Sequence, residues 1–218
     1  MNIDCLDARA KLSARSGASK FFRSLAGLAA LALCAGCGSS RPIKYYQITY
    51  PTNSFVAQDA IDATLVVTPF EASHLYLDNR IVYGFDSPEM GTYQYQRWAD
   101  PPMEMLQNAL VRGLRSSGRF KGVYTGRTSS ATQFILGGRL YDFREIDGPA
   151  IMARLRFDIV MRDRKSGAVV WTHSYSYDEP VPEKTVVAVA TAMDKNVQRS
   201  IQEIEAGLTD YFRVHPAQ

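Results

Sequence analysis

Residues 151–177 read IMARLRFDIVMRDRKSGAVVWTHSYSY, and this stretch decides the fold. Apolar side chains recur at every second position from Ile151 to Met161, which is the period of a strand with one buried face. The other face carries Arg154, Arg156, Asp158 and Arg162, and we expect it to be solvated. Residues 163–167 favour a turn, and Val169 to Tyr177 returns as the antiparallel partner strand.

The period becomes helical after this hairpin, from Thr185 to about Arg213. One apolar stripe recurs every three or four residues: Ala190, Met193, Val197, Ile201, Ile204, Leu208 and Tyr211. A one-sided stripe of this kind predicts a long helix that packs against a sheet. A lipid-carrying groove under this helix is an alternative interpretation that the pattern leaves open.

The N-terminal half predicts further strands and a second helix. Strands are expected at residues 43–50, 63–68, 80–85, 92–97, 120–124 and 134–143. A helix should begin at Asp100-Pro101-Pro102, with the aspartate as its cap, and stop at Gly118. The predicted fold class is α/β (α+β): a two-layer sandwich with a mostly antiparallel or mixed sheet and two main helices on one face.

The N-terminus carries the pattern of a lipoprotein signal. Basic residues precede a short apolar run from Leu25 to Ala35, and the small residues Ala35 and Gly36 stand directly before Cys37. Cleavage between Gly36 and Cys37 would leave Cys37 as the lipidated N-terminus, because Leu33 to Cys37 looks like a lipobox. We therefore expect a signal peptide at residues 1–36, a lipidated tether at 37–43 and a single domain at 44–218.

Charge and cysteine content exclude several functions. Without its first 36 residues the chain has 20 basic and 20 acidic residues, which is not the basic surface of a nucleic-acid binder. All three cysteines lie at or before Cys37, so the exported domain has no disulfide, no thiolate nucleophile and no Cys-ligated zinc. We predict no cofactor and no metal.

The sequence contains no catalytic motif. The GxSxG, HExxH and P-loop patterns are absent, and the three histidines, His74, His173 and His215, form no recognisable set. A histidine in an aromatic strand, such as His173, is more often structural than catalytic. The pair Gly137-Gly138 could suggest a phosphate cradle, but glycines within a strand more often mark a bulge or a close backbone approach. We predict that the protein is not an enzyme.

Three aromatic residues are candidates for partner binding: Tyr93, Tyr95 and Trp98. Trp98 could be an exposed anchor for a partner, since tryptophan is enriched at interfaces. It could instead pack the predicted hairpin of strands 80–85 and 92–97 onto the helix that follows, and we favour this interpretation. Tyr93 and Tyr95 share one face of their strand, which could meet a partner at a free sheet edge.

Three short segments carry a family resemblance: YYQI at 45–48, YLDNRIVY at 76–83 and RWADPP at 97–102. In this order behind a lipobox, they resemble the ABC-type transport auxiliary lipoproteins, which include the PqiC-like partners of MCE-domain lipid transport systems. Asn79 departs from the residues that such families often show at this position, as does the long charged N-terminus.

The resemblance implies a non-catalytic lipoprotein of the outer membrane that faces the periplasm. It would dock an MCE/ABC-type intermembrane phospholipid transport complex, form a homo-oligomeric ring and support membrane integrity. Gly38, in place of the aspartate that commonly retains lipoproteins at the inner membrane, favours the outer membrane. A stand-alone periplasmic lipid-binding or outer-membrane assembly lipoprotein is the alternative function.

Overall fold

A computed structural model of the chain describes residues 41–49, 60–126 and 132–217. The elements in chain order are β1 (Lys44–Tyr46), β2 (Ile61–Val67), β3 (Glu71–Ala72), η1 (His74–Tyr76), β4 (Arg80–Phe85), β5 (Gly91–Trp98), α2 (Pro102–Ser116), β6 (Phe120–Thr125), β7 (Phe134–Asp147), β8 (Met152–Asp163), β9 (Val169–Pro180) and α3 (Val186–Val214). The signal segment with Gly36 and Cys37 lies outside the described residues, so lipidation and the domain boundaries stay predictions.

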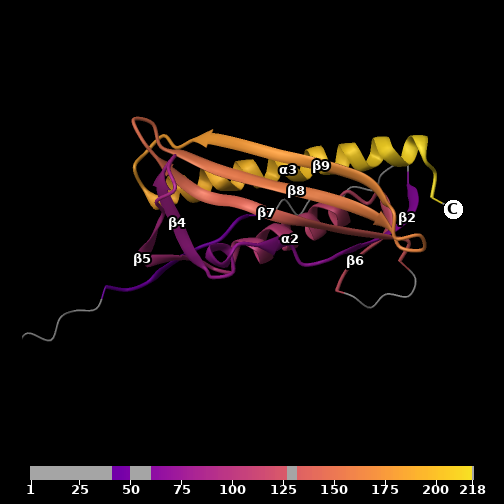
Figure 1. Ribbon diagram of the computed structural model, residues 1–218, viewed down its shortest axis with the longest axis horizontal. Helices are drawn as coiled ribbons and strands as arrows, with labels where there is room; N and C mark the ends of the chain where they lie inside the picture. Colours follow the sequence, from indigo (N-terminus) through magenta and orange to yellow (C-terminus); the bar gives the residue numbers. More distant parts are fainter. Residues whose placement is uncertain (1–40, 50–59, 127–131, 218) are drawn as a thin grey trace, which may run out of the picture. The chain divides into compact units, whose positions relative to one another are not determined.

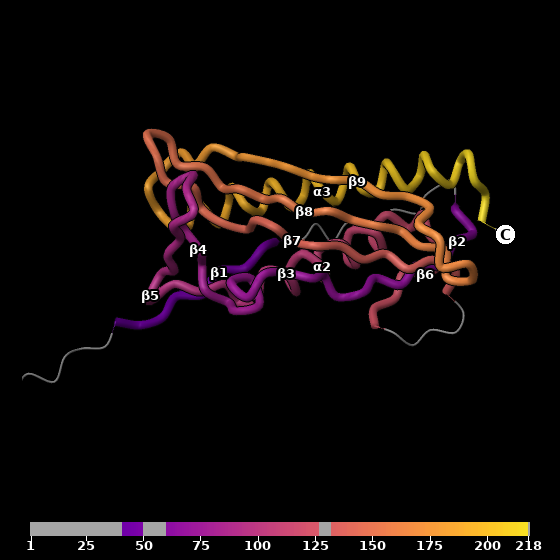
Figure 2. The backbone as a smooth tube through the Cα atoms, in the orientation of Figure 1, coloured from indigo at the N-terminus to yellow at the C-terminus, as the bar shows by residue number. Residues whose placement is uncertain are grey.

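Strand β7 joins the sheet together. One side of it pairs with β8 in antiparallel register along most of its length, and β9 continues beyond β8. Its other side pairs in parallel with β2, then β3, then β4 as the strand proceeds. Figure 2 shows the result: β4 and β5 lie at one end of β7, and β2 and β6 lie at the other.

Both helices cover the same face of this mixed sheet. Helix α3 packs along β8 and β9, behind them in Figure 1, while α2 packs on β2, β6 and α3. The expected fold class, a mixed sheet with two helices on one face, is therefore confirmed. The two predicted hairpins, β4–β5 and β8–β9, are also confirmed as antiparallel pairs.

One continuous core lies between the two layers. The inward side chains of β8, Ala153, Leu155, Phe157, Ile159 and Met161, are fully buried, as their alternation predicts. The stripe of α3 is buried as well, except that Phe212 occupies the last core position and Tyr211 is only partly buried. Residues from Ile43 onward form one compact unit.

Arg154 does not lie on a solvated face as we expected, since it is only 7% exposed. Its guanidinium makes two hydrogen bonds to Asp178 of β9, at 2.7 and 2.8 Å, and one to Asp86 at 2.7 Å. Asp86 belongs to the β4–β5 loop, which the ion pair holds against this end of the sheet. The alternation within β8 carries no information about this loop. The predicted solvated face therefore included Arg154, which is buried.

The expected cap of the first helix is wrong. Helix α2 begins at Pro102 with Pro101 as its N-cap, and no side chain caps it. The amides of Glu104 and Met105 bond instead to the carbonyl of Pro101. Asp100 lies one position too early because the extended backbone of Pro101 delays the first helical turn. The stop is as predicted: Gly118 follows the helix with a φ of 63°.

Candidate functional site

Trp98 lies inside the core and not on the surface. It is 1% exposed, and its ring meets Phe143 edge to face at a centroid distance of 5.3 Å. Of its two interpretations, packing between the hairpin and the rest of the core agrees with this position. A side chain at this depth is out of reach of a partner that binds the folded domain.

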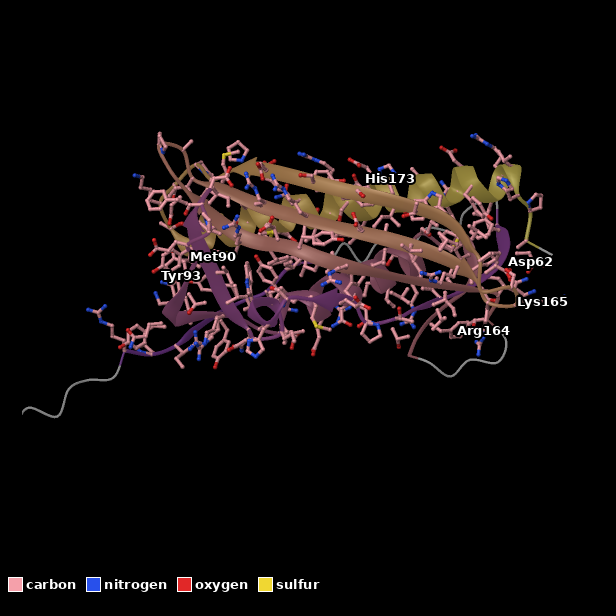
Figure 3. All side chains as sticks on the ribbon, in the orientation of Figure 1. Asp62, Met90, Tyr93, Arg164, Lys165 and His173 are labelled. Atoms are coloured by element: carbon pink, nitrogen blue, oxygen red, sulfur yellow. The ribbon has the colours of Figure 1, made fainter. Side chains whose placement is uncertain are left out.

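Tyr93 is half-buried at the hairpin end of the sheet, close to Met90 in Figure 3. Its ring packs on Tyr83 at 4.8 Å, and its hydroxyl donates a 2.9 Å hydrogen bond to Oε2 of Glu145. Glu145 belongs to β7, two strands away across β4. Burial and the neighbouring Glu145 carboxylate raise the pKa of Tyr93, so Tyr93 is a hydrogen-bond donor at neutral pH.

Glu145 was not among the site residues predicted from the sequence, because no local pattern singles it out. It is 3% exposed, and burial raises the pKa of its carboxyl group, with a further rise from the like charge of Asp147. The hydrogen bond from Tyr93 acts in the opposite direction and lowers this pKa. A buried carboxylate near a second acidic group is costly for the folded state unless it has a purpose or a counter-ion.

Tyr95 is the most exposed of the three predicted aromatic residues, with 36% of its surface accessible. Strand β1 lies directly beside β5 in parallel register, and its Tyr45 is 62% exposed. The structure therefore separates the three candidates: Trp98 is in the core, Tyr93 is beside Glu145, and Tyr95 faces solvent.

A cavity of about 590 Å³ opens beside Tyr93 and Glu145. Lys44 of β1 and Lys184, directly before α3, also line it. Two contacts position these lysines: Thr49, just after β1, bonds twice to Asp194 of α3, and Thr185 caps the first turn of α3 by accepting from the amide of Ala188. The cavity thus gathers residues that lie far apart in the sequence.

The other motifs of the sequence have structural positions. Gly138 lies where an added Cβ would meet the carbonyl of Asp158 and the ring of Phe70, so the glycine pair marks a close backbone approach. The bulge of β7 falls later, between Leu140 and Asp142. His173 is exposed on β9, where its ring stacks on Trp171 and lies tilted against Tyr175.

Residues 41–49, 60–126 and 132–217 lack two further features. No group of three or more His, Cys, Asp or Glu side chains there could hold a metal ion. None of its helices is long and apolar enough to span a membrane.

One family model matches this chain from residue 46 to residue 205, and it is described as the ABC-type transport auxiliary lipoprotein component. The match includes β2 to β9 and most of α3. No curated protein matches the chain.

Two solved structures share the fold at low sequence identity, and a third is less similar. A crystal structure of a protein from Xanthomonas campestris, described as DUF330, is 20% identical, covers 76% of this chain and 94% of its own, and has a TM-score of 0.67. A crystal structure of an uncharacterised protein is 14% identical, covers 77% and 99%, and has a TM-score of 0.63. A PelC dodecamer from Paraburkholderia phytofirmans is 14% identical, covers 65% and 92%, and has a TM-score of 0.41.

Proposed function

Because this chain belongs to the family of ABC-type transport auxiliary lipoprotein components, we propose that it is a lipid-anchored accessory subunit of an ABC transport system. The observation that carries this proposal is the family match over residues 46–205, behind a sequence from Leu33 to Cys37 that predicts lipidation. The protein acts by binding and not by catalysis.

The finer assignment rests on the resemblance of the three short segments and on Gly38. We propose that lipidated Cys37 anchors the domain in the outer membrane, facing the periplasm. There it docks the MCE-domain protein of an intermembrane phospholipid transport system, and copies of the chain assemble into a ring. Loss of the protein would then weaken the outer-membrane barrier.

The docking surface is proposed to include Tyr95, which is exposed on β5, next to the strand that carries the exposed Tyr45. Tyrosine offers a large contact area and a hydroxyl at little cost in side-chain entropy, and it is common at interfaces. Replacement of Tyr95 by alanine should weaken the complex without unfolding the domain, because solvent already reaches this side chain.

Co-purification tests the proposal. The full-length tagged protein is extracted in mild detergent from cells that also express an MCE-domain protein, a permease and an ATPase. We expect the MCE-domain protein to be retained by the wild type and released by Tyr95→Ala. Lys121→Gln, at the other end of the sheet, is the control and should retain it. Absence of any transporter subunit from the wild-type preparation would contradict the assignment.

Native mass spectrometry separates the alternative function. A ring without bound lipid supports docking, whereas a monomer that carries phospholipid and no transporter subunit supports a stand-alone lipid-binding lipoprotein. A ring that carries lipid is the outcome that both the docking role and the inference below predict.

A further inference from the structure

The cavity beside Tyr93 is lined by two acidic and two basic side chains, which we call its acidic wall and its basic wall. Glu145 and Asp147, near the end of β7, form the acidic wall. Lys44 and Lys184 contribute the basic side chains. A cavity of about 590 Å³ that is lined by both signs of charge is large enough for a small zwitterionic group and the atoms bonded directly to it.

The acidic wall lacks a cation. Among the described residues, Glu145 forms no ion pair. Its carboxyl group accepts a hydrogen bond from Tyr93, and its other hydrogen-bond partner is the acidic side chain of Asp147. Carboxylates this deeply buried normally have a positive partner or several donors. Asp147 adds a second acidic group, so this wall suits an ammonium group, which can donate three hydrogen bonds.

The basic wall lacks an anion. Neither Lys44 nor Lys184 forms an ion pair with another described residue, and both are exposed. By contrast, Lys121 and Lys195 pair with Asp62 and Glu179, at 2.6 and 3.2 Å. An ammonium side chain is a compact point charge that binds phosphate well.

We propose that this cavity binds a phosphoethanolamine group. The ligand's ammonium lies against Glu145 and Asp147, and its phosphate lies between Lys44 and Lys184. Choline would fit the acidic wall poorly because its quaternary nitrogen has no N–H to donate, and glycerol would leave Glu145 without a cation.

The source of this group is the membrane, and this step rests on the proposed function. Lys44 is seven positions after Cys37, a stretch that spans at most about 25 Å when fully extended. A lipidated Cys37 therefore keeps the cavity within reach of phosphatidylethanolamine head groups. Free phosphoethanolamine carries the same two charges, so the experiment includes both.

Binding is measured on the full-length lipidated protein in detergent micelles. One arm titrates free phosphoethanolamine by calorimetry, and the other uses native mass spectrometry with phosphatidylethanolamine, phosphatidylcholine and phosphatidylglycerol at equal concentration. We expect retention of phosphatidylethanolamine over the other two lipids. Glu145→Gln and the double change Lys44→Gln with Lys184→Gln should each weaken binding by about tenfold or more, the usual loss for one charge-assisted hydrogen bond. Lys121→Gln should bind as the wild type does.

Each outcome decides between sources or rejects the site. Binding of the free compound but not of the lipid supports the site with a soluble ligand. Equal retention of all three lipids, no binding in either arm, or unchanged binding in both sets of variants would overturn it. A transporter peptide cross-linked at Lys184 in place of lipid would also overturn it.

The same variants are scored for co-purification with the MCE-domain protein. If the wild type binds neither ligand but still co-purifies with the MCE-domain protein, only the ligand assignment is rejected. Intact ligand binding without any transporter subunit rejects only the proposed function.

Discussion

Arg154 connects three segments of the chain through a single guanidinium. Its side chain is 8% exposed, and it pairs with Asp178 on β9 and with Asp86 in the β4–β5 loop. We expect Arg154→Met to lower the free energy of unfolding by about 2–3 kcal/mol, the usual loss for hydrogen bonds to charged groups. Arg156→Met is the matched control and should change it by less than about 0.5 kcal/mol, because Arg156 is 43% exposed and lies 3.8 Å from its acidic partner.

Acid should remove the stabilisation that Arg154 provides. The hydrogen bonds from Arg154 hold the pKa of Asp178 below its ordinary value. The stabilisation is therefore complete above a pH of about 3.9, the pKa of an aspartate in the unfolded chain. It is lost as the pH falls through the lower pKa that Asp178 has in the folded protein. Urea unfolding should show wild type and Arg154→Met converging below about pH 4. A constant difference between them from pH 7 to pH 3 would contradict this account.

Glu145 should act on stability in the opposite direction. Burial raises the pKa of its carboxyl group, so the folded state binds a proton more tightly than the unfolded state does. The loss of stability caused by Glu145 is therefore absent below a pH of about 4.3, the pKa of a glutamate in the unfolded chain. It grows as the pH rises through the higher pKa that Glu145 has in the folded protein. Glu145→Gln keeps an oxygen that can accept a hydrogen bond from Tyr93. The variant should be at least as stable as the wild type at pH 8. At pH 4 its free energy of unfolding relative to the wild type should be lower than at pH 8. Urea unfolding of both proteins at the two pH values tests this.

A stable Glu145→Gln variant would also strengthen the ligand experiment. Lost binding could then not be ascribed to unfolding. A residue that lowers the stability of the fold and lies beside a cavity is typical of a binding site.

At the scale of single elements, β7 depends on the absence of a side chain at Gly138. A Cβ there would meet the backbone carbonyl of Asp158 on β8, which cannot move without breaking the pairing of the two strands. Gly138→Ala should therefore cost about 3 kcal/mol or more in thermal or urea unfolding. Gly148→Ala, in the loop between the same strands, meets only a carbonyl at 3.4 Å and should be close to neutral. Similar costs for both variants would show that the contact at Gly138 does not matter.

The two helices are in close contact at Gly113 of α2. An added Cβ would meet Cγ2 of Ile201 on α3, although alanine is otherwise favoured over glycine in a helix by about 1 kcal/mol. We expect Gly113→Ala to destabilise the protein in the wild-type background and to stabilise it when Ile201 is alanine. The coupling energy from this double-mutant cycle should be about 1–3 kcal/mol, measured by urea unfolding. Additive effects would exclude direct packing at this point.

The elements with a clean period were predictable from the sequence. Strand β8 and helix α3 each bury one regular face, and a regular face is visible in the residue pattern. Strand β7 was predicted to end at Phe143, four residues before its end in the structure. It continues to Asp147 because β4 and β8 pair with Arg144 and Glu145 and because Tyr93 supplies a donor to Glu145.

The site was much less predictable than the fold. Tyr93 was selected for its place in an aromatic strand, but its partner Glu145 lies 52 positions away on another strand. Lys44 and Lys184 meet at one cavity only because β1 pairs with β5 and α3 begins beside them. Parallel pairings of β7 with three strands create this proximity, and no local pattern specifies such long-range pairing.

At the scale of the whole molecule, membrane attachment should depend on the acyl chains alone. The chain from Cys37 onward has equal numbers of acidic and basic residues, so it lacks the excess of positive charge that draws proteins to anionic lipid. Two or more acyl chains, by contrast, give stable anchoring that salt does not screen. The lipid anchor and the surface charge therefore predict different responses to salt.

Replacement of Cys37 by serine tests this directly. Vesicles of phosphatidylglycerol and phosphatidylcholine are used, since they exclude the ethanolamine ligand proposed above. The wild type, labelled with radioactive palmitate, should sediment with the vesicles at low and high salt. Cys37→Ser should carry no label and stay in the supernatant under both conditions, with an unchanged unfolding midpoint. Label on the serine variant would place the lipid on another residue, and sedimentation of that variant at low salt alone would mean that a basic surface, and not the acyl chains, holds the domain at the membrane.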